Sequence, residues 1–304
     1  MSDNYKFSTL SLHAGQRPDP TTGACATPIY QTSAYKFNDT GHAANLFGLK
    51  EFGNIYTRLM NPTTNVLEER VAALEGGVAA VATSSGHAAQ FTVFHMLLEP
   101  GDEILASNKL YGGSMTQMGH SFQKFGWKTN FVEPSSENFK AALNENVKAI
   151  FVESLANPGG IVTDLASIAA VAKEAGIVMI VDNTLATPYL CRPIEHGADI
   201  VVHSLTKFLG GHGNSLGGII VDSGKFDWMQ NDKYPTFSKP CDSYHGLVIG
   251  DTFGLAMGNI DFAIACRVLS LRDIGQCLSP QNAFYILNGI ETLPLRMQKH
   301  CDNA

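Results

Sequence analysis

The sequence predicts an α/β fold in which a mostly parallel sheet of seven strands carries helices on both faces. Seven short apolar runs are typical of strands, and helix-length segments separate several of them. The runs are apolar at consecutive positions, as expected of strands that are buried on both faces. Of the 304 residues, 44% are hydrophobic and 16% are charged, which is the composition of a globular protein with a sizeable core.

The first sixty residues precede any regular pattern. Glycine and proline recur there without a sustained period, which predicts an extended arm. A helix is expected from Asn65, because Val66, Leu67, Val71 and Leu74 fall on one face and a glycine pair ends the segment.

The strands and the later helices follow in order. The strands are expected at residues 79–84, 103–107, 129–133, 149–154, 177–183, 199–204 and 217–222, and further helices near 254–272, 280–290 and 293–304. We therefore divide the chain into an arm (1–64), a large domain that contains the sheet (65–260) and a helical segment (261–304).

Charge and cysteine content exclude several classes of protein. With 21 Lys and Arg against 28 Asp and Glu, the net charge is −7, and no basic stripe suggests nucleic acid or an anionic membrane as partner. The apolar runs are too short to cross a bilayer, and the start lacks the pattern of a secretory signal. Six cysteines without a C-x-x-C pair or metal-ligand spacing favour reduced thiols and the cytoplasm over a disulfide framework, and no metal site is expected.

In parallel sheets, ligands bind at the carboxyl ends of the strands, and one lysine stands out there. Lys207 follows the apolar run that ends at Ser204 and precedes a glycine pair. Loss of solvation would lower the pKa of such a lysine, and its free amine could form a Schiff base with a carbonyl. The hydroxyls of Ser204 and Thr206 suit a phosphate. The alternative is an ordinary exposed lysine at a strand–loop junction.

Asp182 ends another buried run, IVMIVDN. A carboxylate at this position is unusual unless it faces a ligand or a cation. The protonated ring nitrogen of pyridoxal phosphate (PLP) is one such ligand, and the pairing would make the ring an electron sink. The alternative is a turn or helix-capping aspartate, since Asn183 and Thr184 follow.

Weaker signals surround these two residues. The amides of Gly86 and His87 would lie at a helix N-terminus and could bind an anion, although a small-residue turn is also good packing. Tyr111 could stack on a flat ring or be a turn aromatic. Tyr56 and Arg58 lie in the arm, where the arginine could bind a phosphate or be a solvated surface residue.

Together these residues form a set suited to one cofactor, PLP: a lysine, an aspartate, a ring platform and phosphate donors. Walker and G-x-G-x-x-G patterns are absent, so simple nucleotide binding has less support.

Longer segments carry a resemblance to a known family. They are the start SLHAGQ, the segments FGLKEFGNIYTRLMNPTTNVLEERVAALEGG and FSKPCDSYHGL, and the end LRDIGQCLSPQNAFYILNGIETLPLRMQKHCDNA. In these the chain resembles the PLP-dependent enzymes of cysteine and methionine metabolism, of fold type I, and within them the O-acetylhomoserine sulfhydrylases. The resemblance implies a PLP-dependent transferase of methionine biosynthesis that is a homodimer or homotetramer.

The resemblance also implies roles for single residues. Lys207 would bind the cofactor covalently and act with Tyr111 in catalysis. Asp182 would pair with the pyridine nitrogen, Tyr111 would stack on the ring, and Asn157 would lie near the ring hydroxyl. Gly86, His87, Ser204 and Thr206 would hold the phosphate, and Tyr56 and Arg58 would reach the phosphate of a neighbouring subunit.

The implied reaction is a γ-replacement. O-acetylhomoserine and sulfide, or methanethiol, would give homocysteine, or methionine, and acetate. The alternatives are cystathionine γ-synthase-like or γ-lyase-like chemistry, or an inactive PLP-binding fragment. Gly113 stands where some γ-lyases of the family carry cysteine, which disfavours the lyase reaction. The chain is expected to stop before a smaller C-terminal domain, whose arginine binds the substrate carboxylate in the family.

Overall fold

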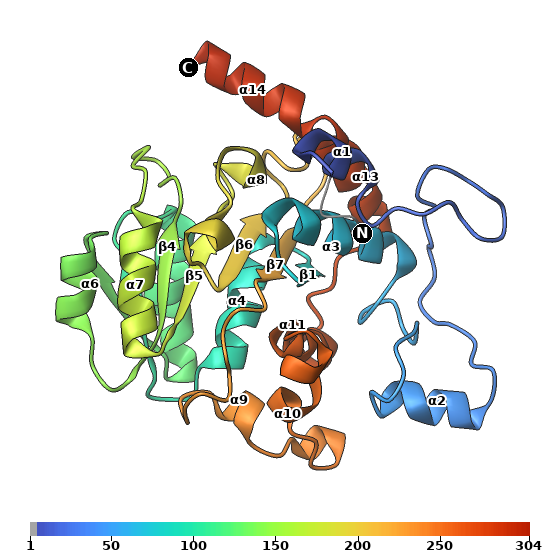
Figure 1. Cartoon of the computed structure of the whole chain (residues 1–304), viewed down its shortest axis with the longest axis horizontal. Helices are drawn as coiled ribbons and strands as arrows, with labels where there is room; N and C mark the ends of the chain where they lie inside the picture. Colours follow the sequence, from blue (N-terminus) through green and yellow to red (C-terminus); the bar gives the residue numbers. More distant parts are fainter. Residues whose placement is uncertain (1–4) are drawn as a thin grey trace.

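The computed structural model describes residues 5–304, which form one sheet of seven strands with helices on both sides (Figure 1). The strands are β1 (Ala79–Thr83), β2 (Glu103–Ser107), β3 (Lys128–Val132), β4 (Val147–Glu153), β5 (Val178–Asp182), β6 (Ile200–Ser204) and β7 (Gly218–Asp222). Each lies within two residues of its predicted bounds.

The helices are short apart from five of 11–14 residues, namely α3, α4, α7, α13 and α14. They are α1 (Phe7–His13), α2 (Thr40–Phe47), α3 (Pro62–Glu75), α4 (Gly86–Leu97), α5 (Gly112–Thr116), α6 (Ser136–Ala142), α7 (Leu165–Ala175), α8 (Thr187–Leu190), α9 (Pro235–Ser238), α10 (Ile249–Phe253), α11 (Asp261–Ala265), α12 (Arg272–Ile274), α13 (Pro280–Glu291) and α14 (Leu293–Asn303). Segments of 3₁₀ or π helix cover residues 117–121, 122–125, 193–196, 242–244, 255–257 and 266–271.

The strand order is β1-β7-β6-β5-β4-β2-β3. Neighbours from β6 through β5, β4 and β2 to β3 pair in parallel, whereas β7 runs antiparallel between β1 and β6. The prediction of a mostly parallel sheet with helices on both faces is confirmed. Because the parallel strands share one direction, their carboxyl ends meet at one edge of the sheet.

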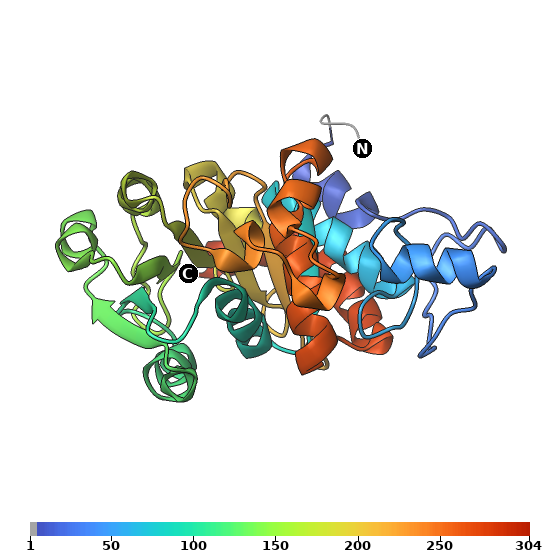
Figure 2. The ribbon, with the colours of Figure 1, turned by 90° about the horizontal axis from the view of Figure 1, so that it is seen from below.

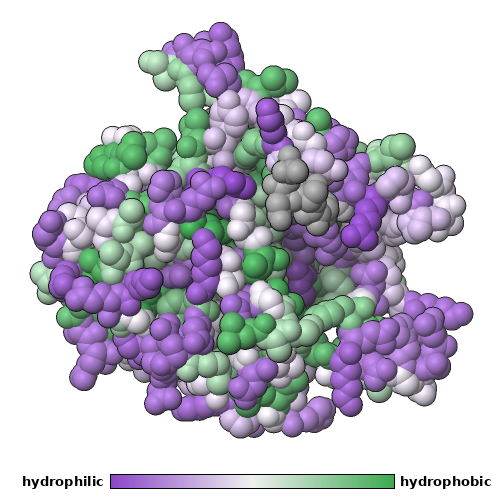
Figure 3. Space-filling model, viewed as in Figure 1, coloured by the Kyte–Doolittle hydropathy of each residue, from purple (hydrophilic) through white to green (hydrophobic). Residues whose placement is uncertain are grey.

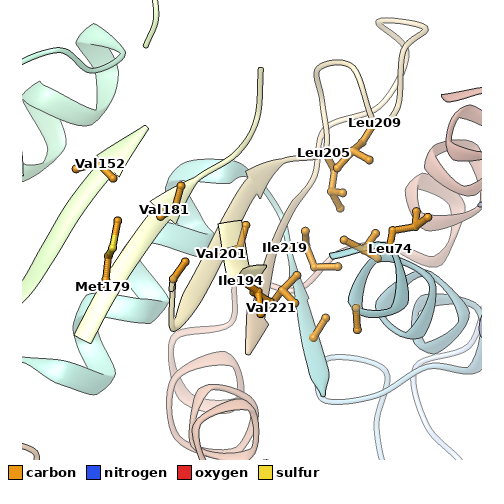
Figure 4. Close-up of a cluster of buried hydrophobic side chains, with 14 of the residues drawn as sticks. Leu74, Val152, Met179, Val181, Ile194, Val201, Leu205, Leu209, Ile219 and Val221 are labelled. Atoms are coloured by element: carbon orange, nitrogen blue, oxygen red, sulfur yellow. The ribbon is translucent and has the colours of Figure 1, made fainter. Parts of the chain in front are cut away.

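Two hydrophobic cores lie on the two faces of this sheet. Along β5, Met179 and Val181 belong to the core under α3, α7 and α13, while Val178 and Ile180 belong to the core under α4 and α11. Figure 2 shows α4 and α7 on opposite sides of the sheet, and Figure 4 shows side chains of the first core. Successive side chains of a strand point to opposite faces of the sheet, so two residues an even number of positions apart face the same core.

Helix α3 illustrates how the local sequence sets an element. Asn61 caps its start by accepting a hydrogen bond from the Thr63 amide at 3.0 Å, and Pro62 occupies the first turn. Gly76 ends it in the left-handed conformation with φ of 81°. The helix begins three residues earlier than predicted because the cap lies before the apolar stripe.

The arm contains two short helices that its composition did not reveal. Helix α1 packs on α3 and α13, and Asp39 caps α2 by accepting from the His42 amide. In both Figure 1 and Figure 2 the arm around α2 lies on the side of the molecule opposite α6 and α7.

The predicted helix near 254–272 is broken into shorter pieces, because Gly258 adopts a positive φ of 82° before α11 begins. Among residues 5–304, none of the helices combines the length and hydrophobicity that crossing a bilayer requires. Hydrophobic residues are scattered among hydrophilic ones on the face seen in Figure 3.

Candidate active site

The candidate site lies where β4, β5 and β6 end. Their last residues are Glu153, Asp182 and Ser204, and in register Glu153 lies opposite Asp182. Side chains two positions apart on a strand point to the same face, and Ile180 and Val202 belong to the core under α4. Glu153, Asp182 and Ser204 therefore lie on the α4 side of the sheet. The structure therefore places two carboxylates and a hydroxyl on one side of one sheet edge.

Asp182 is held by its own turn and by α4. One carboxylate oxygen accepts the Thr184 amide at 2.9 Å, as the turn alternative predicted. The other accepts from Nε2 of Gln90 at 3.2 Å. Gln90 is 3% exposed, also donates to the Ser114 hydroxyl, and leaves its own Oε1 without a hydrogen-bond partner among the described residues. Within residues 5–304, no cation forms a salt bridge with Asp182.

The start of α4 meets the end of β6. Ser85 caps the helix by accepting from the Ala88 amide at 3.1 Å. The amides of Gly86 and His87 have no acceptor in the part of the chain that the structure describes. A Cβ on Gly86 would lie 2.9 Å from Cβ of Ser204, so only glycine fits between the helix and the strand end. Two free amides and a serine thus meet at a helix N-terminus, which favours an anion.

The segment after β6 carries Lys207 between two anchored leucines. Leu205 and Leu209 are buried in the core on the α3 side, as Figure 4 shows, and Lys207 itself is exposed. The Thr206 hydroxyl is paired with the backbone of Gly217.

Arg296 of α14 also holds this segment, by donating to the Phe208 carbonyl at 2.8 Å and to the Gly289 carbonyl at 2.7 Å. Sequence reasoning missed Arg296, because nothing near it in sequence points to Lys207.

Tyr111 and Asn157 lie on the turns that follow β2 and β4. The Tyr111 ring is 49% exposed, and its centroid is 5.9 Å from that of His87. Glu153 accepts the Tyr111 amide at 2.6 Å and the Asn157 amide at 2.8 Å. Burial and the nearby Asp182 raise the pKa of Glu153 to about 7. The sequence offered one signal for this residue, its position at the end of a buried strand.

The arm residues occupy a different place. Tyr56 and Arg58 line a groove with Tyr244 and Arg272, and Arg58 donates a hydrogen bond to the Arg272 carbonyl. The Arg58 guanidinium lies 5.5 Å from the centre of the Tyr56 ring. Within residues 5–304 no hydrogen bond or salt bridge joins either side chain to Lys207 or Asp182.

A buried polar network supports the strand ends from the opposite face. Asn183 donates to Glu75 of α3 at 2.9 Å and accepts from the Ser154 hydroxyl at 2.6 Å. His203 lies 2.6 Å from the same Glu75 oxygen, and both side chains are fully buried. In the pairs Glu153-Ser154, Asp182-Asn183 and His203-Ser204, one residue faces the candidate site and its neighbour joins this network.

These donors fit PLP. A carboxylate without a cation suits a protonated ring nitrogen, and free amides at a helix N-terminus suit a phosphate. An exposed lysine between anchored leucines suits a covalent bond to the aldehyde, and the half-exposed Tyr111 ring suits stacking. The unpartnered oxygen of Gln90 shows that the polar groups here are not fully satisfied within residues 5–304.

Comparisons with known proteins agree with this chemistry. Residues 8–304 match the family described as Cys/Met metabolism PLP-dependent enzyme. The chain is 54% identical over its whole length to the O-acetyl-L-homoserine sulfhydrylase of Leptospira meyeri and covers 70% of that protein. It is 50% identical to the homocysteine synthase of Schizosaccharomyces pombe, with 99% of this chain and 70% of the relative covered.

Solved structures extend the similarity to three dimensions. A crystal structure from Campylobacter jejuni, of a protein assigned as an O-acetylhomoserine (thiol)-lyase, superposes with a TM-score of 0.95 at 40% identity and contains a pyridoxyl-lysine phosphate residue. The match covers 99% of this chain and 74% of that one. The cystathionine gamma-lyase of Lactobacillus plantarum gives a TM-score of 0.79 at 32% identity, over 99% and 67% of the two chains. The expected fold type and cofactor are confirmed, and the chain belongs to the Cys/Met metabolism PLP-dependent enzymes.

Proposed function

We propose that the chain catalyses the γ-replacement of acetate in O-acetylhomoserine by sulfide, which yields homocysteine. The observation that carries this proposal is the activity for which its relatives are named: proteins 54% and 50% identical to it are an O-acetyl-L-homoserine sulfhydrylase and a homocysteine synthase. Methanethiol in place of sulfide would give methionine by the same exchange.

The residues at the strand ends are proposed to hold PLP, each by its own chemistry. The amine of Lys207 binds the aldehyde carbon, the Asp182 carboxylate keeps the ring nitrogen protonated, and the Tyr111 ring covers the ring face. The remaining proposed contacts are the Gly86 and His87 amides and the Ser204 and Thr206 hydroxyls to the phosphate, and Asn157 to the ring hydroxyl.

When bound, PLP supplies an electron sink for negative charge that develops at the substrate Cα. The residues of this chain move the protons. The Lys207 amine, once released, takes the Cα proton and later returns a proton to the substrate. The Tyr111 hydroxyl would assist the exchange of amines, and its half-exposed ring leaves it accessible for that role.

We further propose that the active unit is a dimer or tetramer in which Tyr56 and Arg58 reach the PLP phosphate of a partner. In support, the arm presents exposed aromatic residues beside their groove, Phe47 at 59% and Phe52 at 58% exposed.

We also propose the division of the chain into an arm (1–64), a large domain (65–260) and a helical segment (261–304). Cytoplasmic location is proposed from the six free thiols.

Mixing Lys207→Ala with Arg58→Ala tests the shared site. A hybrid dimer holds one site with both residues intact, so the mixture should regain tight, lysine-linked PLP on that site. A mixture that behaves as the average of its two parents would contradict the sharing.

The proposed cofactor chemistry is tested by visible absorption with added PLP. The parent and the control Lys239→Ala, at an exposed lysine, should show the band of lysine-bound PLP, and Lys207→Ala should lack it. Homocysteine formed from O-acetylhomoserine and sulfide would support the proposed reaction. Cystathionine formed faster from cysteine, or no product from PLP-loaded protein, would refute it.

A further inference from the structure

Glu153 connects the two turns that carry Tyr111 and Asn157. One of its carboxylate oxygens accepts the Tyr111 amide at 2.6 Å and the other accepts the Asn157 amide at 2.8 Å. The two turns follow different strands and are 46 residues apart in sequence, so this side chain links segments that the chain itself does not connect.

The two side chains on these turns have few other anchors. Neither the Tyr111 hydroxyl nor the Asn157 side-chain amide makes a hydrogen bond within the described residues. The Tyr111 ring is half exposed and contacts the His87 ring from one side. Where these side chains lie therefore depends on how their backbones are held.

The chemistry of the contact requires a carboxylate. Two backbone N–H groups approach two oxygens of one side chain, and a carboxylate is the side chain that offers two acceptors and no donor. A glutamine would place its own NH₂ against one of the amides. Glu153 is 5% exposed, and within residues 5–304 no cation forms a salt bridge with it.

This arrangement carries an electrostatic cost. An ionised carboxylate that is buried without a cation is unfavourable, and Asp182 on the adjacent strand adds repulsion. Both effects raise the pKa of Glu153 to about 7, burial being the larger. A neutral glutamine would avoid this cost, but it could accept a hydrogen bond from only one of the two amides.

We propose that Glu153 is a positioning residue that sets the Tyr111 ring and the Asn157 side chain at the cofactor site through their two backbone amides. The inference rests on the proposed function, because it takes these two side chains to touch PLP. Glu153 lies beside Asp182 at the strand ends and is proposed to act through the two turns rather than by contact with PLP.

Two variants remove one or both of the hydrogen bonds that Glu153 accepts. Glu153→Gln keeps one acceptor and should release one turn, and Glu153→Ala should release both. In the apoprotein, hydrogen exchange should become faster in only one of the peptides covering residues 108–116 and 154–162 for Glu153→Gln, and in both peptides for Glu153→Ala. In the PLP-loaded protein, PLP should dissociate at least tenfold more readily from the alanine variant than from the parent. The matched control is Asp227→Asn, an exposed carboxylate that accepts the Met229 amide at 2.9 Å away from the site.

A double-mutant comparison separates positioning from plain stability. If Glu153 acts through the two side chains, Glu153→Gln should weaken PLP binding in the parent but have no further effect when Tyr111 and Asn157 are already alanine. An equal effect in both backgrounds, or unchanged exchange in the two turns, would overturn the inference. Failure of the proposed function would appear differently: the parent would lack lysine-bound PLP, while the exchange of the apoprotein would still report on Glu153.

Discussion

Replacing Gly86 by alanine tests the junction between α4 and β6. A Cβ at this position would lie 2.9 Å from Cβ and 3.1 Å from Cα of Ser204. Gly86 is the first residue of α4 and its φ is not positive, so alanine is compatible with the backbone. The variant therefore adds a steric contact without adding backbone strain.

The size of the effect follows from that distance. Carbon atoms in good contact lie about 3.5–4.0 Å apart, so the helix must move by about 0.6–1.1 Å. Overpacking of this kind costs about 1–3 kcal/mol. If the displacement falls on the free amides of Gly86 and His87, the affinity for PLP drops by about 5- to 150-fold.

The assay is a titration of the apoprotein with PLP, read by the visible band of lysine-bound cofactor. Gly112→Ala is the matched control, because Gly112 also begins a helix and a Cβ there meets nothing within 4 Å. The reasoning would be refuted if Gly86→Ala bound PLP as tightly as Gly112→Ala. If Gly86→Ala lowered the free energy of unfolding but not the affinity for PLP, the added methyl group would displace another part of the structure and not the start of α4.

Two further predictions concern stability. Asn183→Ala removes three hydrogen bonds, two buried and one partly buried, so we expect the free energy of unfolding to fall by about 3 kcal/mol. A fall below about 1 kcal/mol in urea unfolding would contradict the network. Burial, with a smaller contribution from Asp261, raises the pKa of Asp222 from 3.8 to about 7. Above about pH 4 the folded state therefore keeps a proton on Asp222 that the unfolded chain has released. As the pH rises from about 5.5 to about 8, the contribution of Asp222 to the free energy of unfolding falls by about 2 kcal/mol. Unfolding measured at both values should show at least this fall, because Glu153 and Asp199 also have a pKa raised to about 7. Asp222→Asn should reduce the fall by about 2 kcal/mol, and a fall that is the same in Asp222→Asn and the parent would contradict this expectation.

The local sequence determined the elements of the sheet and the residues at its carboxyl edge. Runs such as IVMIVDN are apolar at successive positions because both faces of the strand are buried, and this property is visible without coordinates. For the same reason Asp182 and Lys207 stood out, since polar groups that directly follow buried strands gather at one edge of a parallel sheet. The family resemblance added Asn157, whose sequence context alone carried no chemical signal.

Tertiary structure decided which groups meet. That β7 inserts antiparallel between β1 and β6 follows from packing of the whole sheet, which no local pattern records. Hydrogen bonds from Gln90 to Asp182 and from Arg296 to the Lys207 segment join residues about 90 positions apart. Glu153 likewise accepts the amides of two turns, at Tyr111 and Asn157, that only the folding of the sheet brings together. Periodicity reports the burial of a strand or helix, whereas a contact between side chains depends on how those elements are brought together in space.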